Sequence, residues 1–291
     1  MVERSLPWLM RGMWVIVLLV GSETLDGALE DNGRATALRV AALIAWIAGV
    51  AAMAVPSVGS LTATRVIVPV AVPVAVTAWI AGAPAGMAVA FVVTALLTTI
   101  LAASADIGRV FVQASAYGHE DRHPLRPPAA YLSVAVLAWL LWAGLGITAA
   151  VATSEGPIWL AALLGAATLA GMLLGLPRWH RLSRRWLVLV PVGLVVHDDL
   201  VLAETIMWRR QQLDRIGLAP AGTDAADLTG PSAGHALEVR TTESVTVVLS
   251  AATRGGSLRP IHLTGALVAP TRPGRALAMA AERRLPVGAI G

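Results

Sequence analysis

The sequence has no cysteine and no lysine, and it carries few charges for its length. Without Cys, disulfides, zinc–thiolate sites and thiol catalysis are excluded. Only 14% of the 291 residues are charged, whereas a soluble domain has about 25%. Hydrophobic residues make up 56% of the chain, and ten Trp stand against two Tyr and two Phe. This composition indicates a membrane protein rather than an ordinary soluble one.

The missing lysine is interpreted as a nucleotide-composition bias. All 22 basic residues are Arg, but Arg enrichment alone does not specify the bidentate geometry of a phosphate site. The basic pI of 10.8 does not indicate nucleic acid either. From residue 186 onward, ten Arg are balanced by nine acidic residues, so we expect no nucleic-acid partner.

Long runs without Asp, Glu, Arg or Lys lie in the first 177 residues. A membrane-spanning helix needs about 20 predominantly apolar residues. The runs are Val40–Thr64, Val66–Ala105, Pro127–Ser154 and Gly156–Pro177. The second run is too long for one helix, and Gly82-Ala83-Pro84-Ala85-Gly86 near its middle predicts a turn. We therefore predict a hairpin of helices at about 65–81 and 84–105.

The first hydrophobic segment is weaker than the others. Gly12–Ser22 is apolar but short, so a spanning helix must also include Leu6–Met10 and Thr24–Leu29. A cleaved signal peptide is the alternative, although no A-x-A cleavage site is evident. With this segment retained, the sequence predicts an all-α transmembrane bundle of six spans.

The placement of Arg predicts the orientation of these spans. With the amino terminus in the cytoplasm, only Arg34 and Arg39 fall outside. Ten Arg then fall inside: Arg4, Arg11, Arg65, Arg109, Arg122, Arg126, Arg178, Arg181, Arg184 and Arg185. An even number of spans puts both termini in the cytoplasm. We expect a multi-pass protein of the plasma membrane.

The periodicity changes at Trp186, where short β-type runs replace the long apolar runs. The expected strands are Trp186–Val190, Leu194–His197, Val201–Trp208, Gln211–Leu218, His235–Arg240, Ser244–Ser250 and Ile261–Val268. Ala219–Gly234 is expected to be a loop, and Pro273-Gly274 to open a helix at about Arg275–Leu285. The sequence thus predicts a membrane domain over 1–185 and a small cytoplasmic β-barrel plus helix, an α+β domain, over 186–291.

This order of strands and closing helix resembles a pleckstrin-homology-like (PH-like) domain. The whole chain also resembles an uncharacterised family of actinobacterial membrane proteins. That resemblance rests on Val55-Pro56-Ser57 with Ser60-Leu61-Thr62-Ala63, Ser115-Ala116-Tyr117-Gly118 with Pro124-Leu125-Arg126-Pro127-Pro128, and Arg185-Trp186 through Pro191-Val192-Gly193 to His197-Asp198. The first resemblance implies binding of protein or phospholipid partners rather than catalysis. The second implies a topology and no activity.

The string His119-Glu120-Asp121-Arg122-His123 matches the H-E-x-x-H motif. On a helix, His119 and His123 would share one face and could bind zinc, with Glu120 as the catalytic general base. However, Gly118 precedes the string and three Pro follow it, and no third ligand is evident. A charged cytoplasmic loop, free or docked on the C-terminal domain, is therefore favoured over a metalloprotease site, and no metal or other cofactor is expected.

A basic cluster follows the last predicted span. Its members are Arg178, Arg181, Arg184 and Arg185, with Trp179 and Trp186 beside them. Arg and Trp at this position are typical of anchoring at the lipid headgroup level. We therefore expect these four Arg to contact membrane lipids.

Pro69 and Pro73 lie four residues apart within the third predicted span. Each removes a backbone hydrogen bond, so the helix is either kinked or broken around a substrate, as in transporters. The lack of ionisable residues in spans two to six argues against transport. The sequence therefore favours a non-enzymatic scaffold or assembly component whose cytoplasmic domain binds a protein partner. A small-molecule or lipid transporter and a membrane zinc metalloprotease are the alternatives.

Overall fold

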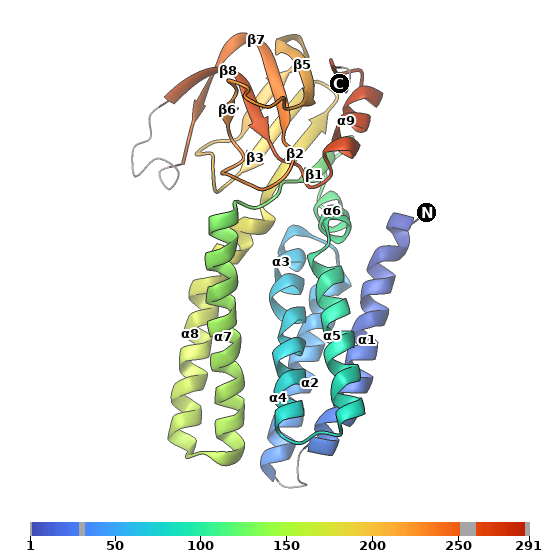
Figure 1. Cartoon of the computed structure of the whole chain (residues 1–291), viewed down its shortest axis with the longest axis vertical. Helices are drawn as coiled ribbons and strands as arrows, with labels where there is room; N and C mark the ends of the chain where they lie inside the picture. Colours follow the sequence, from blue (N-terminus) through green and yellow to red (C-terminus); the bar gives the residue numbers. More distant parts are fainter. Residues whose placement is uncertain (1, 29–32, 251–259, 289–291) are drawn as a thin grey trace. The chain divides into compact units, whose positions relative to one another are not determined.

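The computed structural model describes residues 2–28, 33–250 and 260–288. The chain forms two compact units (Figure 1). The helical unit contains Met1–Phe111 and Ala135–Trp179, and the strand unit contains Val112–Val134 and His180–Gly291. The predicted division into 1–185 and 186–291 differs from this in two respects: the second part of the strand unit begins at His180, and the unit has an earlier part. The chain enters the strand unit twice, because residues 112–134 belong to it as well.

The helical unit is built from long, apolar helices. They are α1 (Val2–Ala28), α2 (Gly33–Ala54), α3 (Val58–Ile67), the 3₁₀ turn η1 (Val68–Val70), α4 (Ala71–Ile80), α5 (Ala85–Ala103), α6 (Ala105–Gln113), α7 (Ala129–Glu155) and α8 (Ile158–Ser183). Within the described residues, five helical segments are long and apolar enough to cross a membrane: Ser5–Ala28, Val58–Ile80, Ala85–Ala103, Ala129–Thr153 and Ile158–Ser183. The apolar part of α2, Arg39–Ala54, is shorter.

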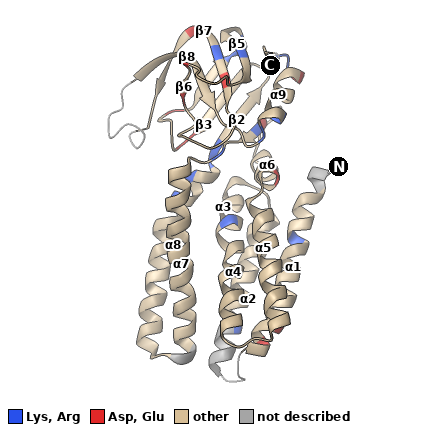
Figure 2. Cartoon of the chain, viewed as in Figure 1, with Lys and Arg blue, Asp and Glu red and all other residues tan. Residues whose placement is uncertain are grey.

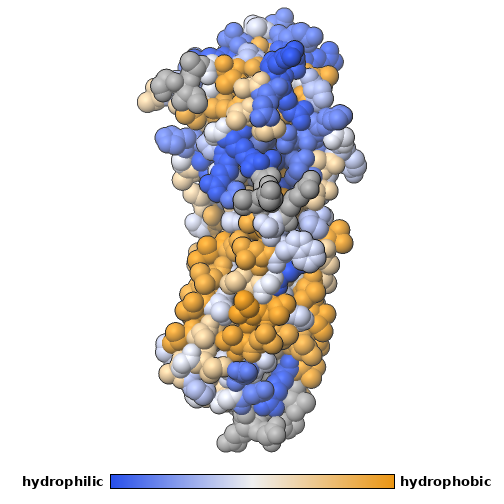
Figure 3. All heavy atoms as spheres, turned by 90° about the vertical axis from the view of Figure 1, so that its right-hand side faces the viewer, coloured by the Kyte–Doolittle hydropathy of each residue, from blue (hydrophilic) through white to orange (hydrophobic). Residues whose placement is uncertain are grey.

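The surface of the helical unit is itself hydrophobic. Leu19 is 60% exposed and Leu141 is 76% exposed, and many other large apolar side chains on these helices face outward. Figure 3 shows hydrophobic residues over most of the helical surface on the face drawn, and Figure 2 shows few charges along the long helices. An exposed apolar surface of this extent fits a lipid environment.

One of the predicted spans was placed wrongly. Val40–Thr64 is broken by Val55-Pro56-Ser57, so α2 ends at Ala54 and α3 begins at Val58. Pro56 disfavours helical geometry at the residue before it. Ser57 then caps α3 in a capping box: the Ser60 N–H donates to Ser57 Oγ at 3.1 Å, and the Ser57 N–H donates to Ser60 Oγ at 2.7 Å.

Two arginines of the helical unit cap the carboxyl ends of neighbouring helices. Arg11 of α1 donates to the carbonyls of Met53 and Ala54 at 2.9 and 2.8 Å, at the end of α2. Arg65 of α3 donates to the carbonyl of Ala102 at 3.3 Å, at the end of α5. The last carbonyls of a helix have no partner within it and carry partial negative charge, so a cation is favourable there. These Arg thus brace helix ends.

The strand unit contains two four-stranded sheets. Its elements are β1 (Asp121–Pro124), β2 (Arg185–Val190), β3 (Gly193–Asp198), β4 (Ile206–Arg209), the 3₁₀ turn η2 (Arg210–Gln212), β5 (Leu213–Leu218), β6 (Ala226–Asp227), β7 (Leu237–Val248), β8 (Pro260–Val268) and α9 (Pro273–Glu282). The sheets have the orders β1-β2-β3-β4 and β5-β7-β8-β6. Only the β6–β8 pair is parallel. The predicted single barrel is therefore wrong in this respect: the described strands do not close into one.

The positions of the later strands agree with the sequence prediction, with local differences. The two strands predicted between His235 and Ser250 form one long strand, β7. Its pairing with β8 shifts register between Arg240 and Val245, which is where the sequence pattern changed. The predicted loop Ala219–Gly234 contains the two-residue strand β6. The expected terminal helix is α9, which begins at Pro273.

A single hydrophobic core fills the strand unit. Both sheets contribute to it, with Trp208 of β4 fully buried, and α9 adds Ala276, Leu277 and Ala280. Leu125, from the residues that precede α7, is 5% exposed and belongs to the same core. The segment before α7 is thus a structural part of the strand unit.

Candidate functional site

The H-E-x-x-H string does not form a helix. His119 and Glu120 precede β1, and Asp121–Pro124 form β1, which pairs antiparallel with β2. His123 is 2% exposed, and the Glu120 carboxylate pairs with Arg122 at 2.9 Å. Among the described residues there is no group of three or more His, Asp or Glu side chains placed to hold a metal. The geometry that a helical H-E-x-x-H zinc site requires is therefore not present at this string.

Local contacts explain why this charged stretch folds as a strand. The Gln113 side chain donates to the carbonyl of Glu120 and accepts from the N–H of Arg122, both at 2.8 Å. Gly118 takes a positive φ of 56°, which turns the chain back from α6. Pro124 comes last in an edge strand, where its missing N–H is tolerated. This agrees with the interpretation that the loop docks on the C-terminal domain.

A row of stacked side chains crosses the first sheet. Arg122 of β1 lies over the ring of Trp186 of β2 at 5.3 Å, and Trp186 stacks on His197 of β3 with ring centroids 4.7 Å apart. His197 Nδ1 lies 3.0 Å from Thr205 Oγ1, and His197 Nε2 lies 3.3 Å from Asp199. Burial lowers the pKa of His197 below its ordinary value of 6.5, against the opposing effect of the Asp199 carboxylate. The row is a packed cross-strand ladder.

The predicted lipid-contact cluster divides into two kinds of residue. Arg178 and Arg181 are exposed near the end of α8, and Arg178 also donates to the carbonyl of Leu174. Arg184 is 44% exposed and pairs with Asp199 at 3.0 Å. Arg185 is 1% exposed, so its guanidinium is not accessible to a lipid headgroup.

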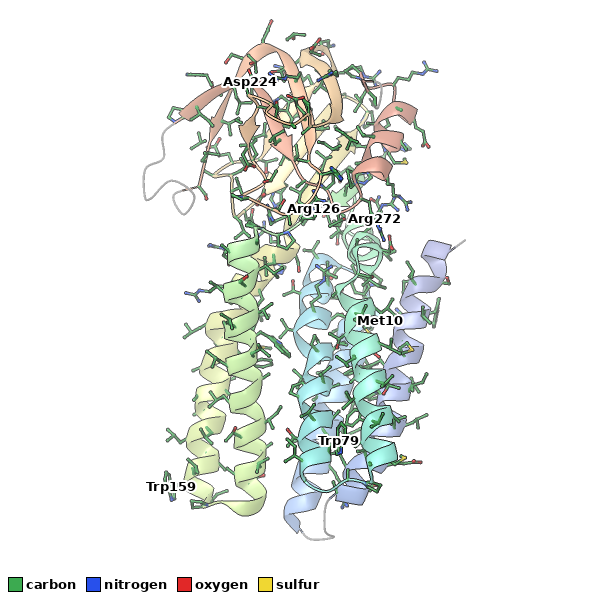
Figure 4. All side chains as sticks on the ribbon, viewed as in Figure 1. Met10, Trp79, Arg126, Trp159, Asp224 and Arg272 are labelled. Carbon is green, nitrogen blue, oxygen red and sulfur yellow. The ribbon has the colours of Figure 1, made fainter. Side chains whose placement is uncertain are left out.

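Arg185 instead forms the buried polar centre of the strand unit. It donates to both carboxylate oxygens of Asp198, at 2.8 and 2.7 Å, and the Asp198 side chain is fully buried. It also donates to the carbonyl of Arg126 at 2.6 Å, so it joins the segment before α7 to the segment after α8. Arg126, labelled in Figure 4, in turn donates to the carbonyl of His235. A bidentate Arg–carboxylate pair of this kind fixes geometry as well as charge.

The Pro69–Pro73 stretch is a break in the helix. The 3₁₀ turn η1 separates α3 from α4, and a cavity of about 310 Å³ lies beside it. Asp26 and Arg39 form an ion pair of 2.6 Å at this cavity. The sequence prediction placed Arg39 outside the membrane, whereas the structure places it within α2, next to Asp26 of α1. The signal in the sequence was their opposite charge, 13 positions apart.

Comparison of the chain with protein-family models, with curated proteins and with solved structures found no match.

Proposed function

We propose that this chain is a non-enzymatic membrane scaffold whose strand unit holds a protein partner. The observation that carries the proposal is the incorporation of β1 into the first sheet, through its four-residue pairing with β2. A module built from residues on both sides of the α7–α8 hairpin is covalently tied to the helices at three points of the chain. Such a module is suited to present a fixed surface.

The chemistry-bearing residues of the strand unit support a structural role. Glu120 is paired with Arg122, and the Asp198 carboxylate accepts hydrogen bonds from Arg185 and from two backbone N–H groups. The buried carboxylate of Glu238 accepts from Thr223 at 2.6 Å and pairs with Arg240 at 2.7 Å. These groups hold strands and loops together. We therefore favour binding of a partner at the surface of the strand unit over catalysis.

We propose that the partner binds at the edge strand β4 and the adjoining β2–β3 turn. Val192 is 59% exposed and Met207 is 44% exposed, and Arg209 and Arg210 lie beside them around one shallow hollow. β4 is the last strand of its sheet. An edge strand with apolar and basic neighbours suits an extended, acidic peptide segment that adds a strand.

The topology completes the proposal. We propose that α2 is a sixth span, that both termini are cytoplasmic, and that the protein resides in the plasma membrane. The bias of Arg supports this orientation. The Asp26–Arg39 pair supports the sixth span, because paired charges reduce the cost of placing α2 in the bilayer. We also propose that the strand unit is a variant of the PH-like fold within an actinobacterial membrane family, with exposed Arg178, Arg181 and Arg184 at the lipid headgroups.

Site-specific photo-crosslinking in native membranes tests the partner site. A crosslinker at Met207 should give one discrete protein adduct, and a crosslinker at Ser244, an exposed position on β7, should not. Arg209→Glu should remove the Met207 adduct while thermal melting stays unchanged. The proposal is contradicted if Met207 and Ser244 give the same adducts, or if Arg209→Glu leaves the Met207 adduct intact.

A further inference from the structure

The cavity beside η1 is almost entirely apolar. It has a volume of about 310 Å³, at the lower end of the roughly 300–1,000 Å³ that ligand pockets occupy. Among the described residues that line it, only Ser22, Asp26 and Arg39 have polar or charged side chains besides the two tryptophans Trp14 and Trp46. A cavity with such walls does not hold ordered water well, because water needs two or more polar partners. Its occupant must be mainly hydrocarbon.

The break in the helix and the small residues around it account for the space. Pro69 and Pro73 have no N–H, so the helix tightens into η1 instead of continuing regularly. Ala71 on one wall and Ala42 and Ala45 on another leave room where larger side chains would meet. The cavity is therefore encoded by the sequence at several separate positions.

Two tryptophans that line the cavity connect α1 and α2. Trp14 Nε1 donates to the carbonyl of Trp46 at 3.0 Å, and Trp46 Nε1 donates to the carbonyl of Trp14 at 2.8 Å. This reciprocal pair fixes α1 against α2 and aligns both indole rings with the cavity. Aromatic walls held in this way are preorganised for an apolar ligand and reduce the entropic cost of binding.

The two charged residues come from consecutive helices, α1 and α2. Asp26 lies in the last turn of α1, Arg39 lies in α2 after the α1–α2 connection, and their side chains are 62% and 29% exposed. The ligand therefore needs a hydrocarbon part for the cavity and a polar part for this ion pair. Amphiphiles of the bilayer have this construction.

The charges at this end favour one class of headgroup. A phosphate beside the Arg39 guanidinium gains a charge-assisted hydrogen bond, and an ammonium beside the Asp26 carboxylate gains another. A purely anionic headgroup would gain the same bond from Arg39 but would bring no cation to the Asp26 carboxylate. We infer that the helical unit binds one zwitterionic, primary-ammonium phospholipid, with an acyl chain in the cavity and the headgroup at Asp26 and Arg39. This site lies in the helical unit, so it stands or falls independently of the partner site on β4.

Native mass spectrometry of the full chain tests this inference. The protein is equilibrated with vesicles of equal parts phosphatidylethanolamine and phosphatidylglycerol and released from detergent under mild conditions. The expected result is one retained phosphatidylethanolamine per chain, in at least tenfold preference over phosphatidylglycerol. Equal retention of both lipids, or no retained lipid, overturns the assignment.

Matched variants locate the bound lipid. Ala42→Phe fills the cavity and should lower retention at least tenfold, whereas Ala41→Phe, at the exposed neighbouring position outside the cavity, should leave it within twofold. If Ala42→Phe lowers the melting temperature of the helical unit, Ala45→Leu serves as the milder filling variant. Equal retention in the filling and control variants would place the lipid elsewhere and overturn the inference.

Headgroup recognition has its own pair of variants. Asp26→Asn should reduce the preference for phosphatidylethanolamine over phosphatidylglycerol at least fivefold, because it removes the carboxylate that pairs with the ammonium. Glu23→Gln, at an exposed position that does not line the cavity, should change it by less than twofold. An unchanged preference in Asp26→Asn would show that this carboxylate does not select the headgroup and would overturn that part of the assignment.

Discussion

The described residues include two neighbouring Arg–Asp pairs that differ strongly in burial. Arg185–Asp198 has side chains that are 1% and 0% exposed, and Arg184–Asp199 has side chains that are 44% and 29% exposed. The distances are similar, at 2.7 and 3.0 Å. The two ion pairs can therefore be compared within one protein, because their charges, residue types and positions in the chain are nearly the same.

Asp198→Asn is the informative perturbation, because it removes one charge and leaves the shape nearly unchanged. The Asn oxygen can still accept from the Leu200 N–H, as Asp198 does at 3.0 Å. What is lost is the compensation of the buried Arg185 guanidinium. Removing one partner of a buried pair costs about 3–5 kcal/mol, since the remaining charge stays desolvated and unpaired. For the exposed pair, Asp199→Asn should cost about 0–1 kcal/mol.

Thermal melting of the purified full chain provides the assay. Limited proteolysis across a temperature series, with fragments assigned by mass, separates unfolding of the strand unit from that of the helical unit. At roughly 2–4 °C per kcal/mol, Asp198→Asn should lower the melting temperature of the strand unit by roughly 6–20 °C. Asp199→Asn should shift it by only a few degrees.

Two results would refute this reasoning. One is a shift in Asp198→Asn no larger than that in Asp199→Asn. The other concerns the double variant Arg185→Met with Asp198→Leu, which replaces the ion pair by apolar side chains and should be more stable than Asp198→Asn alone. If the double variant is destabilised by as much as the two single substitutions added together, the unpaired charge is not the cause of the destabilisation in Asp198→Asn.

Acidification should destabilise the strand unit through His197, because burial lowers the pKa of this residue and the fold therefore favours the neutral ring. The stabilisation is present above the ordinary pKa of 6.5 and is lost as the pH falls from that value through the lowered pKa. Melting at pH 7.5 and pH 5 should therefore show a smaller pH effect in His197→Gln than in the wild type, and an equal effect would exclude this residue as the cause. In α8, Gly175→Ala would place its Cβ 2.7 Å from the Trp179 ring and should lower the free energy of unfolding by about 1–3 kcal/mol. Gly144→Ala in α7, where no atom lies within 4 Å of the new Cβ, should not, and equal melting temperatures of the two variants would contradict this explanation. Elemental analysis should find less than one zinc per chain, unchanged in His119→Ala, and a stoichiometric zinc lost in that variant would restore the metalloprotease hypothesis.

The strands after residue 186 could be predicted from sequence because their signals are local. Short β-type runs are separated by turn residues such as Pro191-Val192-Gly193, and pairs such as β2–β3 are neighbours in the chain. β1 could not be predicted in the same way. Its residues, Asp-Arg-His-Pro, have little strand propensity, and they pair with β2 only across the intervening helices α7 and α8. A long-range pairing of this kind leaves no local pattern.

The helical unit shows a different limit of pattern reading. Val40–Thr64 contains no charge and therefore resembles one span, although Pro56 and Ser57 together signal a helix boundary. Arg39 was predicted to lie in a loop, because a charged residue usually marks the end of a membrane span. The partner that makes this charge tolerable within α2, Asp26, becomes visible only when α1 and α2 are placed side by side.

The two-part origin of the strand unit sets an order for its biogenesis. β1 leaves the ribosome before α7 and α8, and β2 leaves after them. Until both ends of that hairpin meet at Arg185, the β2 edge lacks its neighbour, and an unpaired edge is prone to aggregation. Completion of the first sheet therefore requires that the chain segments on both sides of α7 and α8 come together. A chain that ends before β2 would leave β1 without its partner strand.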